Sequence, residues 1–337
     1  SFSGGSAIAG GVLEYDALDA LGSGALTFTG SSTLRSGVAG TFANPIVVNA
    51  GVTGTVDSQG FYGTLAGVVS GSGGVVKSGV GTIVLTATNV YTGTTTVAAG
   101  ALVIDGTYAL PGWNTPGAYV VSAGAGLGVS NNLSDGDVAT LLGTGNFLPN
   151  AAIGFDTSLG DRTLGTVVSG SIGLFKTGSN TLLVTGSNDY TGPTTVSGGA
   201  LALGAAATLG SSTSSLVMSG GQLDLGGTTQ TRGPVTVSGA FGGGDTIRNG
   251  TLTASSITVS NTTGTAILSA DLTASGNVTK SNAGLAILSG SSAITGSLVV
   301  NNSGRLESSG AVSGLASVSV QTGSMAVTSG TLSTVRF

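Results

Sequence analysis

Apolar residues alternate with Thr and Ser along much of the chain, in short runs separated by turns that contain Gly or Asn. In the stretch TIVLTA from 82 to 87, Ile83 and Leu85 fall on one face of an extended chain, and the Thr residues fall on the other. A period of two with many β-branched residues predicts β-strands, and runs of about four to seven residues predict short ones. The pattern therefore indicates an all-β chain built from many short strands.

One of these stretches recurs along the chain. GVVKSGVGTIVLTATNVYTGTTTVAAGALVID from Gly74 returns as GLFKTGSNTLLVTGSNDYTGPTTVSGGALALG from Gly173, an offset of 99 residues (173 minus 74). A third, weaker copy starts at Asn277 and reads NVTKSNAGLAILSGSSAITGSLVVNNSGRLESSG. Internal repeats of this kind are typical of stacked architectures, in which each unit buries its apolar face against its neighbours.

Short strands at this spacing can build a sandwich, a barrel or a solenoid, and the repeat favours the solenoid. We therefore expect a parallel β-helix, formed as a single elongated rod. The expected parts are an N-terminal tail or cap over 1–21, a continuous solenoid over 22–337, repeat units near 56–106, 155–204 and 268–307, and an excursion at 107–147.

Two stretches carry helix signals. SDGDVATLLG predicts a short helix near 134–142, with Ser134 as its N-cap, two Asp residues in its first turn and Gly143 as its stop. The stretch VLEYDALDAL over 12–21 is either a helix or a turn that carries three acidic residues.

The composition narrows the class of protein. The 337 residues include 62 Gly and only 7% charged residues, but the hydrophobic fraction of 40% alternates cleanly, which argues against disorder. Nine Lys and Arg residues are scattered, and the formal net charge is -5, so we expect no binding of nucleic acid. No apolar run reaches the length of about 20 residues that a membrane-spanning helix needs. The chain starts with Ser and has no leader pattern, so we expect the processed part of a longer, exported precursor.

The absence of His and Cys excludes Ser-His-Asp and Cys-His catalysis and the common zinc sites. Glycoside hydrolysis would need two carboxylates at a set separation, one of them with a raised pKa. The candidates are Asp135 with Asp137, Asp156 with Asp161 near Arg162, and Asp224. The first pair is better explained by the start of a helix, and Asp57 and Asp156 are repeat-equivalent turn residues. We therefore predict no catalytic residue and no enzymatic activity.

Calcium is the metal that the sequence suggests most directly. GGGDTI from Gly242 resembles one incomplete copy of a calcium-binding nonapeptide, whereas such sites need consecutive stacked copies. Ser134 to Asp137 is too short for a calcium loop. We predict no metal and no cofactor.

Three positions of the repeat invite a structural interpretation. Asn89 and Asn188 each precede Tyr-Thr-Gly by one residue, and Asn suits a corner because it tolerates the left-handed conformation and bonds its own backbone. Tyr91 and Tyr190 are expected to cap the core with the ring and to keep the hydroxyl in water, with sugar binding as the alternative. The repeated lysines are expected to be solvated turn residues, namely Lys77, Lys176 and Lys280.

The repeat resembles a known family. KSG from Lys77, TIVLT from Thr82, NVYTGTTTV from Asn89 and GAL from Gly100 are similar to the autotransporter-associated β-strand repeat, also called the passenger-associated transport repeat. Its usual form reads like GLxKxGxGTLxLSGxNTYTGxTTVxxGTL. The segment 176–201 matches as well, with Pro193 as a departure, and the flanks raise the covered part to most of 56–260. The resemblance implies a right-handed parallel β-helix on the outside of a bacterial cell, and it implies no chemistry.

These observations leave three functional hypotheses. The preferred one is an extracellular fibre, sheath or layer protein that associates with itself head to tail, because a solenoid with uncharged ends exposes unpaired backbone. The second is a monomeric passenger or adhesin stalk, with the segment around Trp113 as its contact site and surface polysaccharide among the possible partners. The third is a polysaccharide-active enzyme.

Overall fold

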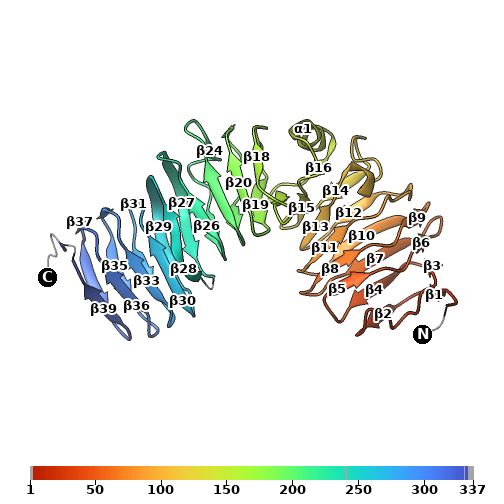
Figure 1. Ribbon diagram of the computed structural model, residues 1–337, viewed down its shortest axis with the longest axis horizontal. Coiled ribbons are helices and arrows are strands. Elements are labelled where there is room, and N and C mark those ends of the chain that lie inside the picture. The colour runs from red at the N-terminus through yellow and green to blue at the C-terminus, as the bar shows by residue number, and fades with distance from the viewer. Residues whose placement is uncertain (1–2, 240, 330, 333–337) are drawn as a thin grey trace. The chain divides into compact units, whose positions relative to one another are not determined.

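The computed structural model describes residues 3–239, 241–329 and 331–332, with side chains for all of these except 241–245. The chain is nearly all β, and its parallel strands stack as a β-solenoid of about 15 turns, which confirms the predicted fold class. The chain divides into two compact units, Ser1–Asp156 and Thr157–Phe337. Figure 1 shows the strands within each unit as stacked, parallel arrows.

Unit 1 (Ser1–Asp156) has three parallel faces. The first face contains β1 (Ser6–Ile8), β3 (Leu26–Phe28), β6 (Ile46–Val48) and β9 (Val69–Gly71). The second face contains β2 (Val12–Tyr15), β4 (Ser32–Ser36), β7 (Thr53–Asp57), β10 (Gly74–Ser78), β12 (Thr95–Val97), β14 (Tyr119–Val121) and β16 (Asn146–Phe147). The third face contains β5 (Gly40–Phe42), β8 (Tyr62–Leu65), β11 (Thr82–Leu85), β13 (Ala101–Ile104), β15 (Gly126–Val129) and β17 (Ala152–Asp156).

The register of these strands explains why alternation specifies the fold. Leu26 pairs with Ile46, and Ile46 pairs with Val69, so equivalent residues of successive coils lie directly above one another. All three are buried, with relative exposures of 1%, 2% and 2%. Because side chains alternate between the two faces of a strand, each inward position becomes part of an apolar column that runs through the stack.

Unit 2 (Thr157–Phe337) is built on the same principle and contains three strands of eight or nine residues. One face contains β18 (Arg162–Leu164), β20 (Thr181–Val184), β23 (Ala200–Leu203), β26 (Gln222–Asp224), β28 (Phe241–Arg248), β30 (Gly264–Leu268), β33 (Leu285–Leu288), β36 (Arg305–Ser308) and β39 (Ser324–Val327). A second face starts with β19 (Gly173–Thr177), β22 (Thr194–Val196), β25 (Leu216–Met218), β27 (Thr229–Val237) and β29 (Thr251–Val259). A two-stranded pairing joins β21 (Ser187–Asn188) to β24 (Thr208–Leu209).

The two nine-residue strands of unit 2 pass over a corner. The first half of β29 pairs with β31 (Asp271–Ala274), which is followed by β34 (Ser292–Ile294) and β37 (Val312–Ser313). Its second half pairs with β32 (Val278–Lys280), which is followed by β35 (Ser297–Val300) and β38 (Ser317–Val320). In β27 the buried residues are the even-numbered ones up to Arg232 and the odd-numbered ones from Gly233 onward, so the strand bends there. A Cβ atom on Gly233 would lie 2.3 Å from the Thr213 carbonyl oxygen. Glycine is therefore required at this bend.

The excursion of unit 1 leaves the strands twice. A 3₁₀ turn, η1 (Thr107–Ala109), precedes β14, and helix α1 (Asp135–Thr144) connects β15 to β16. Ser134 caps α1 in a capping box, as predicted, but Gly143 lies inside the helix, and the C-cap is Gly145. At the start of the chain, the helix alternative for 12–21 is wrong, because β2 pairs in parallel with β4 and a turn follows it.

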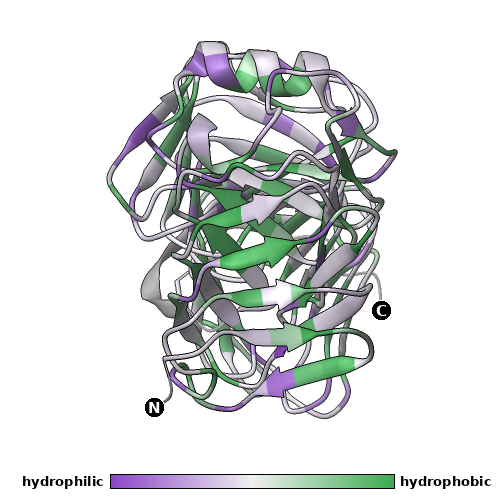
Figure 2. Ribbon diagram, turned by 90° about the vertical axis from the view of Figure 1, so that its right-hand side faces the viewer, coloured by the Kyte–Doolittle hydropathy of each residue, from purple (hydrophilic) through white to green (hydrophobic). Residues whose placement is uncertain are grey.

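The distribution of hydropathy agrees with this architecture. In Figure 2 the hydrophobic positions gather on the strands, and strongly hydrophilic positions are few. The core is aliphatic, and aromatic residues such as Phe28, Phe42 and Phe155 fill it at single positions. Polar groups that do lie inside are concentrated at the corners between faces, and these corners are the candidate functional features of the repeat.

Candidate functional site

Each repeat buries a lysine in the core of the stack. The exposed fractions are 2% for Lys77, 0% for Lys176 and 1% for Lys280. In β10, Lys77 takes an inward position and pairs with Val56 and Val97 in the neighbouring coils, so it interrupts an aliphatic column. The prediction that the three lysines are solvated turn residues is therefore wrong.

The ammonium groups bind the carbonyl groups of the turn that follows each strand. Lys77 Nζ donates to the carbonyl oxygens of Ser78 at 2.7 Å, Gly79 at 2.8 Å and Ala99, in the next coil, at 3.0 Å. An ammonium group has three N–H donors and no acceptor, so it matches three inward-facing carbonyl groups. We call this arrangement the lysine clamp.

The second repeat reproduces the clamp almost atom for atom. Lys176 Nζ donates to the carbonyl oxygens of Thr177 at 2.6 Å, Gly178 at 3.0 Å and Gly198 at 3.1 Å. These three residues lie 99 positions after Ser78, Gly79 and Ala99 (177 minus 78, 178 minus 79, 198 minus 99). The geometry is therefore a property of the repeat rather than of one coil.

The third clamp points partly in the other direction along the stack. Lys280 Nζ donates to the carbonyl oxygens of Ser281, of Asn282 at 2.6 Å, and of Asn261, in the preceding coil, at 3.4 Å. The Asn261 amide donates to three further carbonyl groups, including that of Leu285 at 3.1 Å. A second polar side chain thus supports this corner.

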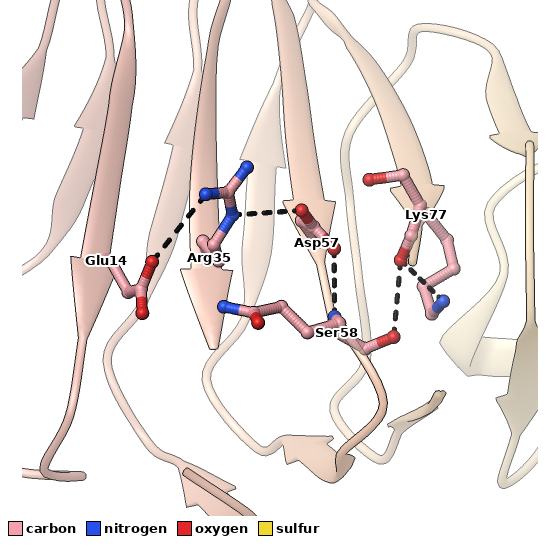
Figure 3. A network of polar contacts seen from close by, with 7 residues as sticks. Glu14, Arg35, Asp57, Ser58 and Lys77 are labelled. Carbon is pink, nitrogen blue, oxygen red and sulfur yellow. Dashed lines mark hydrogen bonds and ion pairs between the residues drawn. The ribbon is translucent and has the colours of Figure 1, made fainter. Parts of the chain in front are cut away.

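The coil below each of the first two lysines contributes a buried hydroxyl to the same turn. Ser58 Oγ donates to the Ser78 carbonyl oxygen at 3.2 Å, and Thr157 Oγ1 donates to that of Thr177 at 3.2 Å. Ser58 and Thr157 are both 0% exposed. Figure 3 shows the first of these corners, where Ser58 and Lys77 converge, beside a row formed by Glu14, Arg35 and Asp57.

Burial controls the electrostatics of the clamps. Desolvation lowers the pKa of Lys77 to about 8, and the nearby Asp57 carboxylate offsets part of this effect. Desolvation alone lowers the pKa of Lys280 to about 8. Lys77 and Lys280 therefore hold their charge at neutral pH, but their pKa values lie close to it.

The repeated asparagines hold corners by bridging coils. Asn89 Oδ1 accepts from the Val69 amide at 2.8 Å, and its Nδ2 donates to the Ala109 carbonyl oxygen at 2.7 Å. Asn188 makes the equivalent bonds, to Val168 at 2.7 Å and to Thr208 at 2.9 Å. The predicted corner position is correct, but most of the bonds run to the coils above and below. A local backbone bond, as predicted, is formed by Asn188, whose Nδ2 also donates to the Gly186 carbonyl oxygen at 3.1 Å.

The repeated tyrosines are fully internal. Tyr91 and Tyr190 are 1% and 0% exposed, and each hydroxyl lies 2.6 Å from a threonine Oγ1, that of Thr95 or Thr194. Burial raises the pKa of both phenols to about 12. The prediction that these hydroxyls stay in water is wrong, and a buried ring does not offer a sugar platform.

Arg232 was not identified from the sequence. It is 2% exposed, and it donates to Thr194 Oγ1 at 3.1 Å and to the Ser215 carbonyl oxygen at 3.2 Å. It also donates to the carbonyl oxygens of Leu209 and Ser211. The signal that could have identified it is parity, since Arg232 follows Gln230 by two residues and both are buried in β27.

The candidate carboxylates hold turns and coils together. Asp224 accepts from the Gly226 amide at 2.9 Å, Asn249 Nδ2 at 2.8 Å and Arg248 Nε at 3.0 Å. Burial opposes ionisation of Asp224, but these hydrogen bonds and the Arg248 charge outweigh it and lower its pKa. A general acid needs a raised pKa, so this environment is the opposite of the catalytic one.

The other acidic candidates have similar tasks. Asp57 accepts from the Gln59 amide at 2.8 Å and from Arg35 Nε at 3.1 Å. Asp161 accepts from the Thr181 amide at 2.7 Å, and Asp137 accepts from the Ser134 amide at 2.8 Å as part of the helix cap. The remaining candidates are placed as follows: Asp135 in the first turn of α1, Asp156 buried at the end of β17, and Arg162 buried at the start of β18.

Within the described residues, no three His, Cys, Asp or Glu side chains form a group that could hold a metal ion. The Asp side chain of the GGGDTI stretch, Asp245, lies outside the described side chains. Trp113 lies half-buried in the turn after η1, and Thr144 Oγ1, at the end of α1, donates to its carbonyl oxygen at 3.1 Å.

Replacing Lys77 by Met tests the clamp. Met preserves an unbranched apolar stem, but it leaves the Gly79 and Ala99 carbonyl oxygens without the ammonium donor, and an orphaned buried acceptor costs about 1–3 kcal/mol. We expect Lys77→Met to lower the free energy of unfolding by that amount in urea, followed by the fluorescence of Trp113, the single Trp of the chain. Arg305→Met removes an exposed cation and serves as the control. Equal stability of the two variants would contradict a clamp.

The pH dependence of stability follows from the lowered lysine pKa values. In the unfolded chain the pKa of a lysine is about 10.4. From about pH 8 upward, therefore, the unfolded state binds more protons than the folded state does. The free energy of unfolding then rises with pH. Above about pH 10 the raised tyrosine pKa values act in the opposite direction. We expect the melting temperature to rise between about pH 7.5 and 9.5, and Lys77→Met to reduce this rise. A flat or falling profile in the wild-type chain would contradict the assignment.

Comparisons with known proteins agree with the repeat geometry. A family model described as the passenger-associated transport repeat matches residues 75–104, 174–203 and 278–307, which include all three clamp lysines. The chain is 31% identical over 252 residues to a protein named adhesin BmaC autotransporter from Brucella suis biovar 1 (strain 1330). That match covers 65% of this chain and 7% of the relative. No solved structure matches the chain significantly.

Membrane insertion through a helix finds no support in the described part of the chain, where α1 has ten residues and no helix has the length and apolarity to span a bilayer. The repeats, the clamps and the stacked parallel coils thus point to one assignment. The chain is a β-solenoid that carries the passenger-associated transport repeat in three copies, as its sequence indicated.

Proposed function

We propose that the chain is a non-catalytic scaffold segment of an adhesin-type passenger on the outside of a bacterial cell. The matching repeat and the similarity to a protein named as an autotransporter adhesin support this location and role. Because the match covers 7% of that relative, the chain would correspond to a small part of such a passenger. Its task would be to extend and to display, rather than to carry out chemistry.

The observation that carries this proposal is the use of the polar residues inside the fold. The lysine clamps, the bridging asparagines and Asp224 all have their hydrogen-bonding groups directed at neighbouring coils or turns. An enzyme of the β-helix type would instead direct carboxylates toward a substrate cleft. These polar residues therefore hold the coils together, as a scaffold requires.

The placement of the Lys and Arg side chains agrees with an extracellular location, where proteases are present. Of nine Lys and Arg residues, five are buried, namely Lys77, Arg162, Lys176, Arg232 and Lys280. Two others, Arg35 and Arg248, lie within paired strands and form ion pairs with Asp57 and Asp224. Proteases that cut after Lys or Arg need an extended, accessible segment, so the folded chain offers them few sites.

End-to-end association is the second candidate. The described strands β38 and β39 expose Val320 at 46% and Val327 at 43%, and β2 exposes Val12 at 54%. Apolar residues beside unpaired strand edges favour stacking on another coil, and little charge is present to oppose it. Such a contact could join two copies into a filament, or it could join this segment to further coils.

Labelling of intact cells tests the proposed location and role. An antibody raised against the purified chain should label unpermeabilised cells that produce the protein, and cells lacking the coding segment should adhere less. Trp113→Ala should reduce adhesion without unfolding the chain, since the excursion is the exposed irregular segment of unit 1. Labelling only after permeabilisation would contradict the location, and unchanged adhesion of the deletion would contradict the role.

Electron microscopy of the purified chain separates the two candidates. Negative-stain images at neutral pH and several concentrations should show single particles if the chain acts as a scaffold within a longer passenger. Long filaments with an axial repeat near the length of one molecule would establish self-association instead. Val320→Lys and Val327→Lys place charge on the exposed edge, so they should abolish any filaments without altering the isolated particles.

A further inference from the structure

A groove runs along one corner of unit 1, where the second face begins. Its first part is a hollow of about 300 Å³ between the corner Tyr91–Thr94 and the excursion, and it is lined by Pro111, Gly112, Thr115 and Ala118 as well. Its second part is a hollow of about 380 Å³ that is lined by residues 51–53, 72–74, 76, 94 and 96. Thr94 lines both hollows, so they adjoin, and together they cross four successive levels of chain. Each volume lies at the lower end of the range of ligand sites.

The Ser and Thr hydroxyl groups of this groove are free to bind a ligand. The six Ser and Thr side chains along it make no side-chain hydrogen bond within the described part of the chain; they are Thr53, Ser72, Thr92, Thr94, Thr96 and Thr115. By contrast, Thr86 and Thr185 donate their hydroxyl groups to carbonyl oxygens of the preceding coil at 3.4 and 3.2 Å. The groove therefore concentrates unused donors and acceptors.

The shape of the groove depends on glycine. A Cβ atom on Gly93 would lie 2.1 Å from the Gly73 carbonyl oxygen, and one on Gly73 would lie 2.4 Å from that of Asn49. These close backbone contacts bring successive coils together at the corner. The hydroxyl residues beside them are consequently stacked at the spacing of the coils, which is about 4.8 Å.

The second repeat shows that the groove is not required by the fold. At an offset of 99 residues, Thr94 corresponds to Pro193, Val76 to Phe175 and Gly73 to Ile172. The clamp lysine and the bridging asparagine are unchanged at the same offset, as in the pair Lys77 and Lys176. The second copy thus replaces three groove-lining positions by bulky apolar residues, and it keeps three of the Ser and Thr residues, which are Ser171, Thr191 and Thr195.

The chemistry of the groove restricts its ligand. No Asp, Glu, Lys or Arg lines either hollow, which disfavours a charged ligand. A peptide strand could not add to the sheet there, because β7, β10 and β12 each have neighbours on both sides. Uncharged hydroxyl and backbone groups that extend over several coils suit an elongated ligand rich in hydroxyl groups.

We propose that this groove of unit 1 binds a neutral polysaccharide, with Thr53, Thr94 and Thr96 as contact residues. The adhesive role of such a site rests on the function proposed above, but binding itself is a property of the purified chain. A failed binding test in solution would therefore contradict the polysaccharide site but not the proposed display on the cell surface. A failed surface-labelling test would contradict the display but not the binding.

The test uses affinity electrophoresis of the full chain in gels that contain one polysaccharide each. The neutral probes are dextran, mannan, galactan and a β-1,3-glucan, and polygalacturonate is the acidic probe. We expect at least one neutral probe to retard the chain. The double variant Val76→Phe/Thr94→Pro should weaken this retardation at least about tenfold in apparent dissociation constant, since it transplants the residues of the second repeat and fills the groove.

The transplanted residues are compatible with the fold. The Val75 amide donates to the Thr94 carbonyl oxygen at 3.0 Å, and the Leu174 amide donates equally to Pro193 at 2.9 Å. The reciprocal variant Phe175→Val/Pro193→Thr is the matched control and should bind as the wild type does. Three results would each overturn the proposal: no retardation by any neutral probe, retardation by polygalacturonate alone, or equal retardation of the two double variants.

Discussion

The stack depends on satisfying backbone carbonyl groups where each coil turns a corner. Parallel strands pair along the faces, but the turns between faces direct carbonyl groups inward, away from both strands and water. A buried ammonium group with three donors meets this need at Lys77 and Lys176, and each one also reaches the next coil. The repeat is therefore defined as much by its corners as by its strands, and one lysine joins a turn to the adjacent level.

This solution places charge in an aliphatic column, where it is costly. Burial lowers the pKa of Lys77 to about 8, which measures the preference of the site for the neutral form. Removing the lysine nevertheless leaves at least two carbonyl groups without its donor, and breaking a buried polar set usually costs more than the set contributes. At two of the corners, uncharged donors also bind carbonyl groups, namely the Ser58 hydroxyl and the Asn261 amide. The clamp is thus a compromise between desolvation and hydrogen bonding.

The sequence predicts the strands because alternation and an internal repeat both report the same periodic burial. The solenoid and the capped helix at Ser134 follow from local patterns and agree with the structure. The structure of the corners does not follow from local patterns, because general residue preferences predict that Lys side chains and tyrosine hydroxyl groups face water. Parity contained the correct answer for Lys77, which lies two residues after the buried Val75 in β10. The partners of Asn89 could not be found, since they lie 20 residues away in coils whose register only the fold defines.

The same division between inward and outward positions explains how a scaffold can carry specificity. Inward residues of the repeat are constrained by the column above and below, so the hydroxyl groups of Tyr91 and Tyr190 make the same hydrogen bond to a threonine in both copies. Outward residues contact only their lateral neighbours, which allows Val76 and Phe175 to differ without disturbing a coil. Recognition in such a chain is therefore free to develop on the outer side of a corner or in an excursion. In unit 1 both features meet at Thr94, where the repeat corner faces the loop that begins with Pro111.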